Sequence, residues 1–414
     1  MGVFDMVDRA AMLVDFVGQQ LGSYLFKITH RTSPEHFTRE RGASSLSFYN
    51  TGLIVLKMIK KAIKDELMDS FYQIDKALEI PSRQAFSRAR EKISYLAFKD
   101  FFKKSCELVV GNTHPKLYRG YRLYAIDGTT FTVGNINEMS SYFGQSTAID
   151  GLAMCRISAV VDVLDDAIAD ATVAGFCEGE RVLAIAQVKK LKSVVDALFL
   201  FDRGYWSPEL VTQIISNGQK FLMRLPSNNN KSSVVVGGER IALRRLIFTL
   251  PCGEPEILIT NIPKEEMSDN EIFALYAKRW GVETKYLELK ARLQIDKFSQ
   301  QSVNAVLQDI YATMYISNLV AFIADSTNDI IQAKTSGKGN KYEQKPNKST
   351  CIAALRKRFI DICLADSPAK RQTQLVRFYH DLSKSVIYKG KSKPRPRDNR
   401  KIKSSRGHYN RPLL

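Results

Sequence analysis

The sequence predicts a mixed α/β protein in which a sheet-forming region is flanked along the chain by helical regions. Between residues 121 and 225, short runs rich in β-branched and aromatic residues alternate with segments of helical spacing. Residues 31–110 and about 350–383 instead carry apolar side chains at helical spacing. With 414 residues, 44% of them hydrophobic, the chain can bury a sizeable core in two or three structural units.

The order of elements in the sheet-forming region indicates the kind of sheet. Two strand-like segments, 156–164 and 167–176, are joined by the acidic pair Asp165–Asp166, as in a hairpin. The other elements are strands at 122–127, 197–205 and 220–225 and helices at 180–191 and from Ser207. Three strands, helix, strand, helix, strand is the order of a ribonuclease H-like mixed sheet with helices on both faces. We expect this domain to occupy residues 121–330.

A strand-rich insertion is predicted at about 226–265, where "SSVVVGG", "RIALRRLIFTL" and "EILITNIP" are separated by Gly and Pro. The next helix is expected to begin at about residue 269. Ser268 and Glu271 have the S-x-x-E spacing of a capping box, and Met267 and Ile272 are placed for a hydrophobic staple.

The chain is strongly basic, with a formal net charge of +18. This charge predicts attraction to polyanions, with nucleic acid as the leading partner and an anionic membrane as the lesser one. The six cysteines and five histidines show no metal-binding spacing, which predicts no zinc site and a reducing compartment. The apolar stretch 309–325 is shorter than the roughly 20 residues a bilayer needs, so we expect a buried helix and no membrane association.

Residues 1–120 are expected to form a helical N-terminal region. On the predicted helix in "IPSRQAFSRAREKI", one face is apolar, formed by Ala85, Phe86, Ala89 and Ile93. The opposite face is predicted to expose Arg83, Arg88, Arg90 and Lys92. This region is a candidate DNA-binding domain, although a helical packing domain with ordinary surface charge fits the pattern about equally.

Residues 331–414 are predicted to contain a mobile Lys- and Gly-rich loop, a helical pair and a basic tail. From Lys389 onward, the tail has ten lysines and arginines and one aspartate. Such a segment is expected to be disordered when free.

Two carboxylates, Asp127 and Asp202, each follow an apolar strand in "LYAIDGTT" and "LFLFDRGY". An acid at the rim of a sheet interior loses solvation, so a cation or several donors must compensate it. Each acid taken alone is equally well explained as a cap or turn residue. For Asp162, Asp165, Asp166 and Asp170, around the predicted hairpin turn, the turn interpretation is favoured.

A third carboxylate, Glu283, lies on the helix that follows the insertion. Two strand acids and one helix acid could hold two Mg²⁺ ions, which prefer oxygen ligands, while Glu288 faces another side of the helix. The same helix carries Tyr276, Arg279, Glu283 and Lys290 at offsets 0, 3, 7 and 14, along one stripe. A solvated face with ordinary ion pairs would give a similar pattern.

The pattern Y-x2-R-x3-E-x6-K, after acids in "IDGT" and "DRGY" and a β insertion, resembles the YREK signature of bacterial insertion-sequence DDE transposases. It is similar to the insertion-sequence-four family in particular, over residues of about 120–300. The resemblance implies a DNA transposase that cleaves element ends and transfers the 3′ hydroxyl into target DNA.

The resemblance also implies a role for each residue of the pattern. Asp127, Asp202 and Glu283 would be catalytic and hold two Mg²⁺ ions, for which Mn²⁺ is expected to substitute. Tyr276, Arg279 and Lys290 would contact the DNA backbone, as suits an Arg fork and a Lys point charge. The implied partners are double-stranded DNA and a second copy of the chain in a synaptic complex. The implied location is the bacterial cytoplasm, in association with the nucleoid.

Two other functions fit parts of the sequence. A stand-alone nuclease would need the three acids without the phosphate-binding residues, and an inactive or domesticated DNA-binding protein could lose any acid. The insertion also lacks a tryptophan of the kind that stacks on a flipped base in related enzymes that form DNA hairpins; Phe248 is a possible substitute. Trp280 could stack on a base or fill the core, and the core is favoured.

Overall fold

The computed structural model describes residues 8–38, 45–58, 60–75, 79–134, 136–146, 151–250, 253–336 and 342–388. The basic tail and residues 337–341 of the predicted mobile loop lie outside these ranges. The chain forms two compact units. A sheet unit comprises Cys106–Phe131 and Ser140–Glu288, and a helical unit comprises Met1–Ser105, Thr132–Met139 and Leu289–Leu414.

This division differs from the three consecutive regions expected from the sequence. Residues 289–330 group with the helical unit, whereas the sequence analysis placed them in the sheet-forming domain. The reason is the long helix α12 (Val303–Thr335), which packs among helices from both ends of the chain. Local sequence patterns carry no information about such distant partners.

The sheet unit is built on a seven-stranded sheet of order β3-β2-β1-β4-β5-β9-β8. Its strands are β1 (Arg122–Gly134), β2 (Ala153–Asp162), β3 (Ala167–Gly175), β4 (Ala197–Phe201), β5 (Lys220–Leu225), β8 (Arg244–Thr249) and β9 (Pro255–Thr260). β1 pairs with β4 and β4 with β5 in parallel, whereas β2 and β3 form an antiparallel hairpin. The predicted mixed sheet and the predicted order of its strands are therefore confirmed, whereas a helix between β1 and β2 was not predicted.

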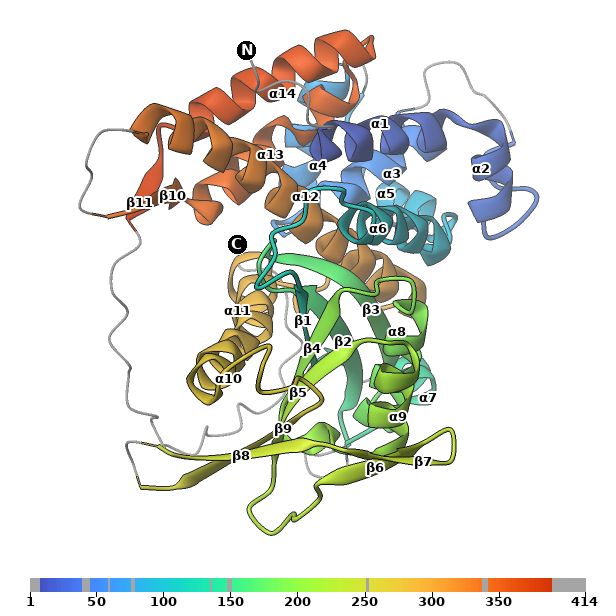
Figure 1. Ribbon diagram of the computed structural model, residues 1–414. Helices are drawn as coiled ribbons and strands as arrows, with labels where there is room; N and C mark the ends of the chain where they lie inside the picture. Colours follow the sequence, from blue (N-terminus) through green and yellow to red (C-terminus); the bar gives the residue numbers. More distant parts are fainter. Residues whose placement is uncertain are drawn as a thin grey trace. The chain divides into compact units, whose positions relative to one another are not determined.

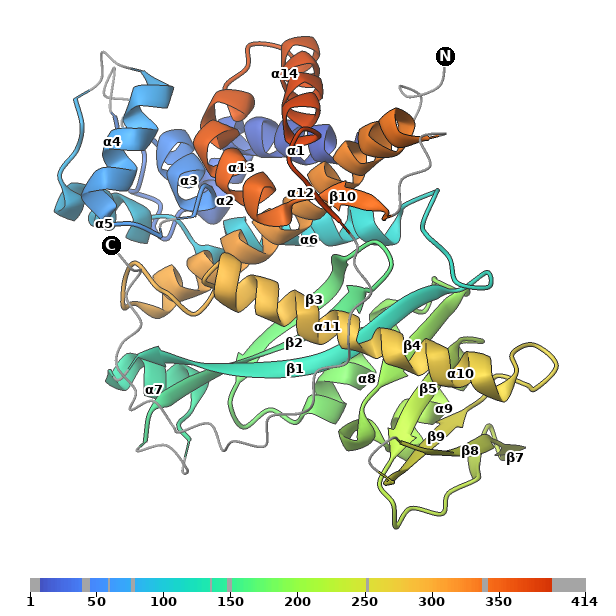
Figure 2. The ribbon, with the colours of Figure 1, turned by 90° about the vertical axis from the view of Figure 1, so that its left-hand side faces the viewer.

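Helices cover both faces of this sheet, as the sequence pattern predicted (Figures 1 and 2). Helices α8 (Glu180–Lys190) and α9 (Pro208–Ser216) lie on one face, and α10 (Asp269–Tyr276) and α11 (Trp280–Leu287) lie on the other. α9 begins at Pro208, and its N-cap Ser207 accepts a hydrogen bond from the backbone N–H of Leu210. α7 (Asn137–Phe143) follows β1 along the chain.

The strand-rich insertion is present, but half of it extends the main sheet. β9 pairs antiparallel with β5, and β8 pairs with β9. The remaining strands, β6 (Ser233–Val236) and β7 (Glu239–Ala242), form a separate hairpin with Gly237 and Gly238 at positive φ in its turn. Ser268 and Glu271 form the predicted capping box, and α10 begins at Asp269 as expected.

Helices of the N-terminal and C-terminal parts of the chain make up the helical unit. They are α1 (Arg9–Gly22), α2 (Tyr24–His30), α3 (Phe48–Leu56), α4 (Ile63–Ile74), α5 (Arg83–Glu91), α6 (Tyr95–Val110), α12, α13 (Lys348–Cys363) and α14 (Pro368–Leu382). A short antiparallel pair, β10 (Gln344–Pro346) with β11 (Val386–Tyr388), was not predicted. α12 contacts α1, α3, α13 and α14 and is the core element of this unit (Figure 1).

The apolar stretch of α12 is a buried helix, as expected. Among the described residues, α12 alone has the length and composition to cross a membrane, yet its apolar window is completely buried in the protein. Its polar residues have partners inside the unit. Asn318, for example, donates a hydrogen bond to Ser105 Oγ at 2.9 Å.

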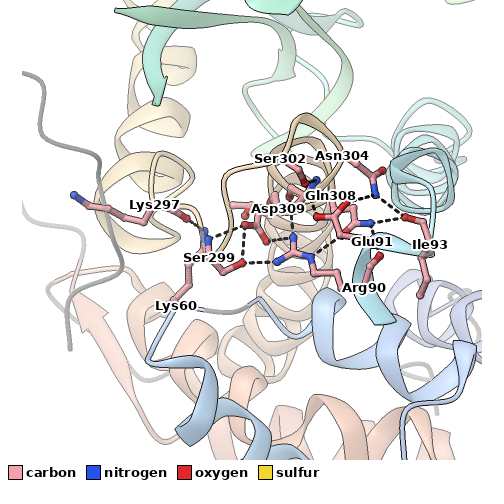
Figure 3. A network of polar contacts seen from close by, with 12 residues as sticks. Lys60, Arg90, Glu91, Ile93, Lys297, Ser299, Ser302, Asn304, Gln308 and Asp309 are labelled. Carbon is pink, nitrogen blue, oxygen red and sulfur yellow. Dashed lines mark hydrogen bonds and ion pairs between the residues drawn. The ribbon is translucent and has the colours of Figure 1, made fainter. Parts of the chain in front are cut away.

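One prediction for the N-terminal region was wrong. Arg90 does not lie on the exposed face of α5 but is 1% exposed, whereas Arg83, Arg88 and Lys92 are exposed as expected. Its guanidinium donates to Asp309 Oδ1 at 2.7 Å and to Gln308 Oε1 at 2.6 Å, both on α12 (Figure 3). Arg90 lies four residues after the buried Phe86, on the face that meets α12.

Asp309→Ala is expected to destabilise the helical unit by about 3–5 kcal/mol, because it leaves the buried Arg90 guanidinium without its charge partner. Replacing both partners by Arg90→Met and Asp309→Leu should restore much of this loss. The free energy of unfolding from chemical denaturation measures both effects. Arg88→Ala, which removes an exposed arginine from the same helix, should change it by less than about 0.5 kcal/mol. An equally small effect of Asp309→Ala would contradict the importance of this ion pair.

Candidate active site

The pairing of β1 with β4 sets the positions of the two strand acids. Ala125 lies opposite Leu200 in this parallel pair. Counting two residues onward from each leads to Asp127 on β1 and to Asp202 directly after β4. The two carboxylates therefore occupy equivalent positions on neighbouring parallel strands.

Asp127 differs in one respect from the prediction, because it does not end its strand. β1 continues to Gly134, and Asp127 marks the point where the completely buried part of the strand ends. The residues after it include Thr129, Thr130 and Phe131, which favour extended structure and prolong the strand. Asp202, in contrast, follows the last residue of β4 as predicted.

The carboxylate of Asp127 is only partly compensated. It accepts a hydrogen bond from the backbone N–H of Gly128 at 2.9 Å and forms no ion pair with the described residues. Burial raises its pKa to about 6. The Gly128 hydrogen bond and the charge of Arg279 lower the pKa, while the carboxylates of Glu180 and Glu283 raise it.

Asp202 both caps a turn of its own segment and contacts Tyr276 of the YREK pattern. Its side chain caps a 3₁₀ turn (Arg203–Tyr205) by accepting the backbone N–H of Arg203 at 2.8 Å. The hydroxyl of Tyr276, at the end of α10, lies 3.4 Å from Asp202 Oδ1 and donates to it. The cap interpretation and the site interpretation of this acid are therefore compatible.

Arg279 and Glu283 form an ion pair between neighbouring helix turns. Arg279 lies in a 3₁₀ segment (Ala277–Arg279) between α10 and α11, and its guanidinium donates to Glu283 Oε1 at 2.8 Å. Burial acts to lower the pKa of Arg279, but Tyr276, Asp202 and Glu283 together outweigh burial and raise it. Arg279 is thus a buried cation that stays charged beside the acids.

Trp280 does not fill the core, so that prediction was wrong. Its side chain is 45% exposed, and the Arg279 guanidinium lies 5.0 Å from the centroid of its ring. The regular helical spacing used in the prediction does not hold here, because Trp280 directly follows the 3₁₀ segment. The indole covers one side of the guanidinium as a cation–π partner.

Lys290 is the member of the predicted set that is not grouped with the others. It lies in a π-helical segment (Glu288–Arg292) and belongs to the helical unit, whereas Asp127, Asp202, Tyr276, Arg279 and Glu283 all belong to the sheet unit. Burial lowers the pKa of Lys290, and the charge of Asp296 partly offsets this.

Sequence reasoning missed three residues around Asp127. Glu180, in the first turn of α8, lies so close to Gly128 that a Cβ on residue 128 would be 2.8 Å from its Oε1. The hydroxyl of Tyr205 is buried and has no hydrogen-bond partner among the described residues. Tyr286 Oη donates to the backbone carbonyl of Asp127 at 2.7 Å. The sequence separations of these three residues from Asp127 match no known motif. The glycine at position 128 does indicate that another group approaches the backbone closely there.

The donor atoms around Asp127 and Asp202 suit a hard divalent cation. Both side chains offer carboxylate oxygens, and Asp127 is desolvated without an ion-pair partner. Glu283 is oriented toward Arg279 instead. Within the described residues, no three acidic, histidine or cysteine side chains are grouped as a metal site.

In the absence of divalent ions, Asp127→Asn should become more stable relative to wild type as pH rises from the ordinary pKa of 3.8 to about 6. The folded state holds the proton of Asp127 more tightly than the unfolded state, so the wild type loses stability as this group ionises, and asparagine cannot ionise. Unfolding free energies across this range in EDTA measure the difference.

Asp381→Asn provides a comparison of opposite sign. The hydrogen bond and charge of Lys384 lower the pKa of Asp381, so its contribution to stability is present above the ordinary pKa and is lost as pH falls. The Asp381 variant should therefore become less stable relative to wild type as pH rises. Parallel curves for the two variants would contradict the assignment of the raised pKa to Asp127.

Comparison with known proteins shows what this chain is similar to. Residues 118–319 match the family model described as "Transposase DDE domain". A putative transposase for insertion sequence element IS4SA from Synechocystis sp. is 28% identical over 134 residues, which cover 29% of this chain and 39%, less than half, of that relative. A cryo-EM structure of a piggyBac transposase synaptic complex with hairpin DNA aligns with a TM-score of 0.45 and 11% identity, over 92% of this chain and 83% of that chain. The family match and the Synechocystis relative confirm the resemblance drawn from the sequence, which is to DDE transposases of the insertion-sequence-four family; the matching region of this chain is residues 118–319.

Proposed function

We propose that the protein is a DNA transposase that cleaves DNA at insertion-sequence ends and transfers the 3′ hydroxyl into target DNA. The observation that carries the proposal is the equivalent position of Asp127 and Asp202 on neighbouring strands, with Arg279 beside both acids and bonded to Glu283. The transposase DDE domain supports the same reaction class.

In this proposal Asp127, Asp202 and Glu283 are the catalytic acids and hold two Mg²⁺ ions, with Mn²⁺ as a substitute. When bound, the metals would polarise the scissile phosphate and activate the attacking oxygen. Glu283 would have to leave Arg279 in order to join the other acids, because one of its oxygens accepts from the guanidinium. Arg279 would then present its planar donors to a phosphate of the DNA backbone.

Tyr276 and Lys290 would complete the contacts to the DNA backbone. The Tyr276 hydroxyl is anchored on Asp202, and burial raises its pKa, so it would act as a neutral donor. For Lys290 the proposal rests on the spacing of the YREK pattern in the sequence.

We also propose that the sheet is ribonuclease H-like. The order β3-β2-β1-β4-β5, with an antiparallel β2–β3 hairpin and parallel β1, β4 and β5, supports this assignment. The additional strands β9 and β8 would then belong to the insertion that precedes the helix of Glu283.

The proposed partners are double-stranded DNA at element ends and at the target, and a second copy of the chain when two ends are paired. The net charge of +18 supports a polyanionic partner. Such an enzyme would act in the bacterial cytoplasm, in association with the nucleoid.

The decisive experiment is a cleavage and joining assay on duplex DNA that carries the sequences flanking this gene, with and without Mg²⁺. Asp127→Asn, Asp202→Asn and Glu283→Gln should each abolish strand cleavage while end binding changes little, because a neutral amide is a weak Mg²⁺ ligand. Asp170→Asn and Glu178→Gln are matched controls outside the site and should retain wild-type cleavage. Full cleavage in any of the three site variants would show that the replaced acid is not catalytic.

The joining step separates this function from that of a stand-alone nuclease. A transposase should join the cleaved 3′ end to a second duplex, whereas a nuclease should release the end without joining. An inactive DNA-binding relative should bind element ends and cleave neither strand with Mg²⁺ or Mn²⁺.

Arg279→Lys is expected to reduce cleavage at least tenfold and to weaken binding to cleaved ends. Lysine keeps the charge but cannot offer two parallel donors to a phosphate, and loss of a positioning contact can cost about 100-fold in rate. The assay is the same, with thermal unfolding as the control for folding. Arg9→Lys, in which the replaced arginine on α1 pairs with Asp325 at 2.9 Å in the helical unit, is the matched control. Wild-type cleavage by Arg279→Lys would mean that Arg279 makes no bidentate contact to a phosphate and that the charges of this helix are ordinary surface charges.

A further inference from the structure

The hydroxyl of Tyr286 joins three elements of the sheet unit. It accepts a hydrogen bond from the backbone N–H of Ala159 on β2 at 3.1 Å and donates to the carbonyl of Asp127 on β1 at 2.7 Å. The ring comes from α11, and the residue is 7% exposed. One side chain thus connects the helix of Glu283 with two neighbouring strands, one of which carries Asp127.

A cluster of ion pairs around a buried lysine attaches the same helix at the preceding residue. Lys285 is 1% exposed, and its Nζ lies 2.9 Å from Asp166 Oδ1 and 2.9 Å from Glu288 Oε1. Asp166 lies in the turn between β2 and β3, so this contact ties α11 to the hairpin. Burial acts to lower the pKa of Lys285, but the two carboxylates raise it overall and keep the lysine charged.

Backbone proximity completes the attachment. A Cβ on Gly281 would lie 2.8 Å from Val163 Cγ1, closer than real side chains approach. Glycine therefore lets the first turn of α11 touch the β2–β3 turn. The helix is therefore attached to the sheet on both sides of Glu283 in sequence, by Gly281 before it and by Lys285 and Tyr286 after it.

We infer that Tyr286 is a positioning residue that sets the placement of Asp127 relative to Glu283 for metal binding. This inference rests on the proposed function, in which these two acids hold the ions. Glu283 precedes Tyr286 by three residues, so both lie within one turn of α11. The hydroxyl contacts Asp127 through its backbone and leaves the carboxylate free for a ligand. Such outer contacts tune metal affinity by orienting the residues that bind the ion.

The test uses the full-length chain and Mn²⁺ as the probe, with the bound ion followed by electron paramagnetic resonance. Tyr286→Phe removes one hydroxyl and should weaken Mn²⁺ binding by about 10- to 100-fold, the range typical of outer contacts to metal ligands. In the cleavage assay, the Mg²⁺ concentration for half-maximal rate should rise, and added metal should restore part of the rate. Binding to duplex element ends should stay within about twofold, because Tyr286 is buried away from solvent and offers DNA no donor.

Tyr315→Phe is the matched control. Its buried hydroxyl also donates to a backbone carbonyl, that of Leu13 at 3.3 Å, but it lies in the helical unit. It should lose a similar amount of thermal stability and keep wild-type Mn²⁺ affinity. Gly281→Ala is a second variant on the same attachment and should also weaken Mn²⁺ binding, even though alanine favours helix over glycine.

The outcomes separate the two proposals. If Asp127→Asn abolishes Mn²⁺ binding while Tyr286→Phe and Gly281→Ala bind Mn²⁺ as the wild type does, Tyr286 is only a packing residue and the positioning inference is overturned. If the wild type binds no Mn²⁺ and cleaves no end DNA, the proposed function itself fails. Weakened Mn²⁺ binding in Tyr286→Phe, with wild-type affinity in Tyr315→Phe, supports the inference.

Discussion

The parallel pairing of β1 with β4 brings the carboxylates of Asp127 and Asp202 to equivalent positions. Placing charged groups at the edge of the buried part of a sheet costs free energy, and this cost explains much of what surrounds them. Burial, and to a lesser extent the nearby carboxylates of Glu180 and Glu283, raises the pKa of Asp127 to about 6. The site therefore contains a buried cation, Arg279, which lies beside both acids and pairs with Glu283. A divalent ion would supply the same compensation more strongly, since it offers two charges and several coordination positions.

Local signals made most of the sheet unit predictable from the sequence. The β2–β3 hairpin follows from two strand-like runs and an acidic turn, and the start of α10 follows from the capping box of Ser268 and Glu271. Asp202 follows its strand as predicted, and the Tyr276 contact to Asp202 joins two motifs that lie 74 residues apart. Each of these features depends on a few neighbouring residues, whose preferences a single sequence displays.

Features that depend on distant partners were missed for that same reason. Arg90 looks like a surface residue until Asp309 and Gln308, more than 200 residues further on, reach it from α12. Glu180 reaches Gly128, and Tyr286 bonds to the backbone of Asp127, only because α8 and α11 cover opposite faces of one sheet. A periodicity argument assigns a residue to a face of its own element, but it cannot say which element will cover that face.

The helix that carries the YREK pattern shows where regular spacing stops being a guide. A uniform helix would place offsets 0, 3, 7 and 14 along one stripe, yet the chain passes through a 3₁₀ segment before α11 and a π-helical segment after it. Each change of hydrogen-bonding pattern shifts the angle at which later side chains project, and π segments are frequent at functional sites.

Two residues of the pattern nevertheless contact the acids. Tyr276 bonds directly to Asp202, and Arg279 bonds to Glu283. Lys290 follows the 3₁₀ segment and lies within the π-helical segment. The turn after it is held inside the helical unit by Lys60, whose Nζ donates to the carbonyl of Gln294 at 2.8 Å and to that of Lys297 at 3.0 Å; Figure 3 shows Lys60 and Lys297. The backbone around Lys290 thus departs from the uniform helix on which the sequence pattern placed it in one stripe with Tyr276, Arg279 and Glu283.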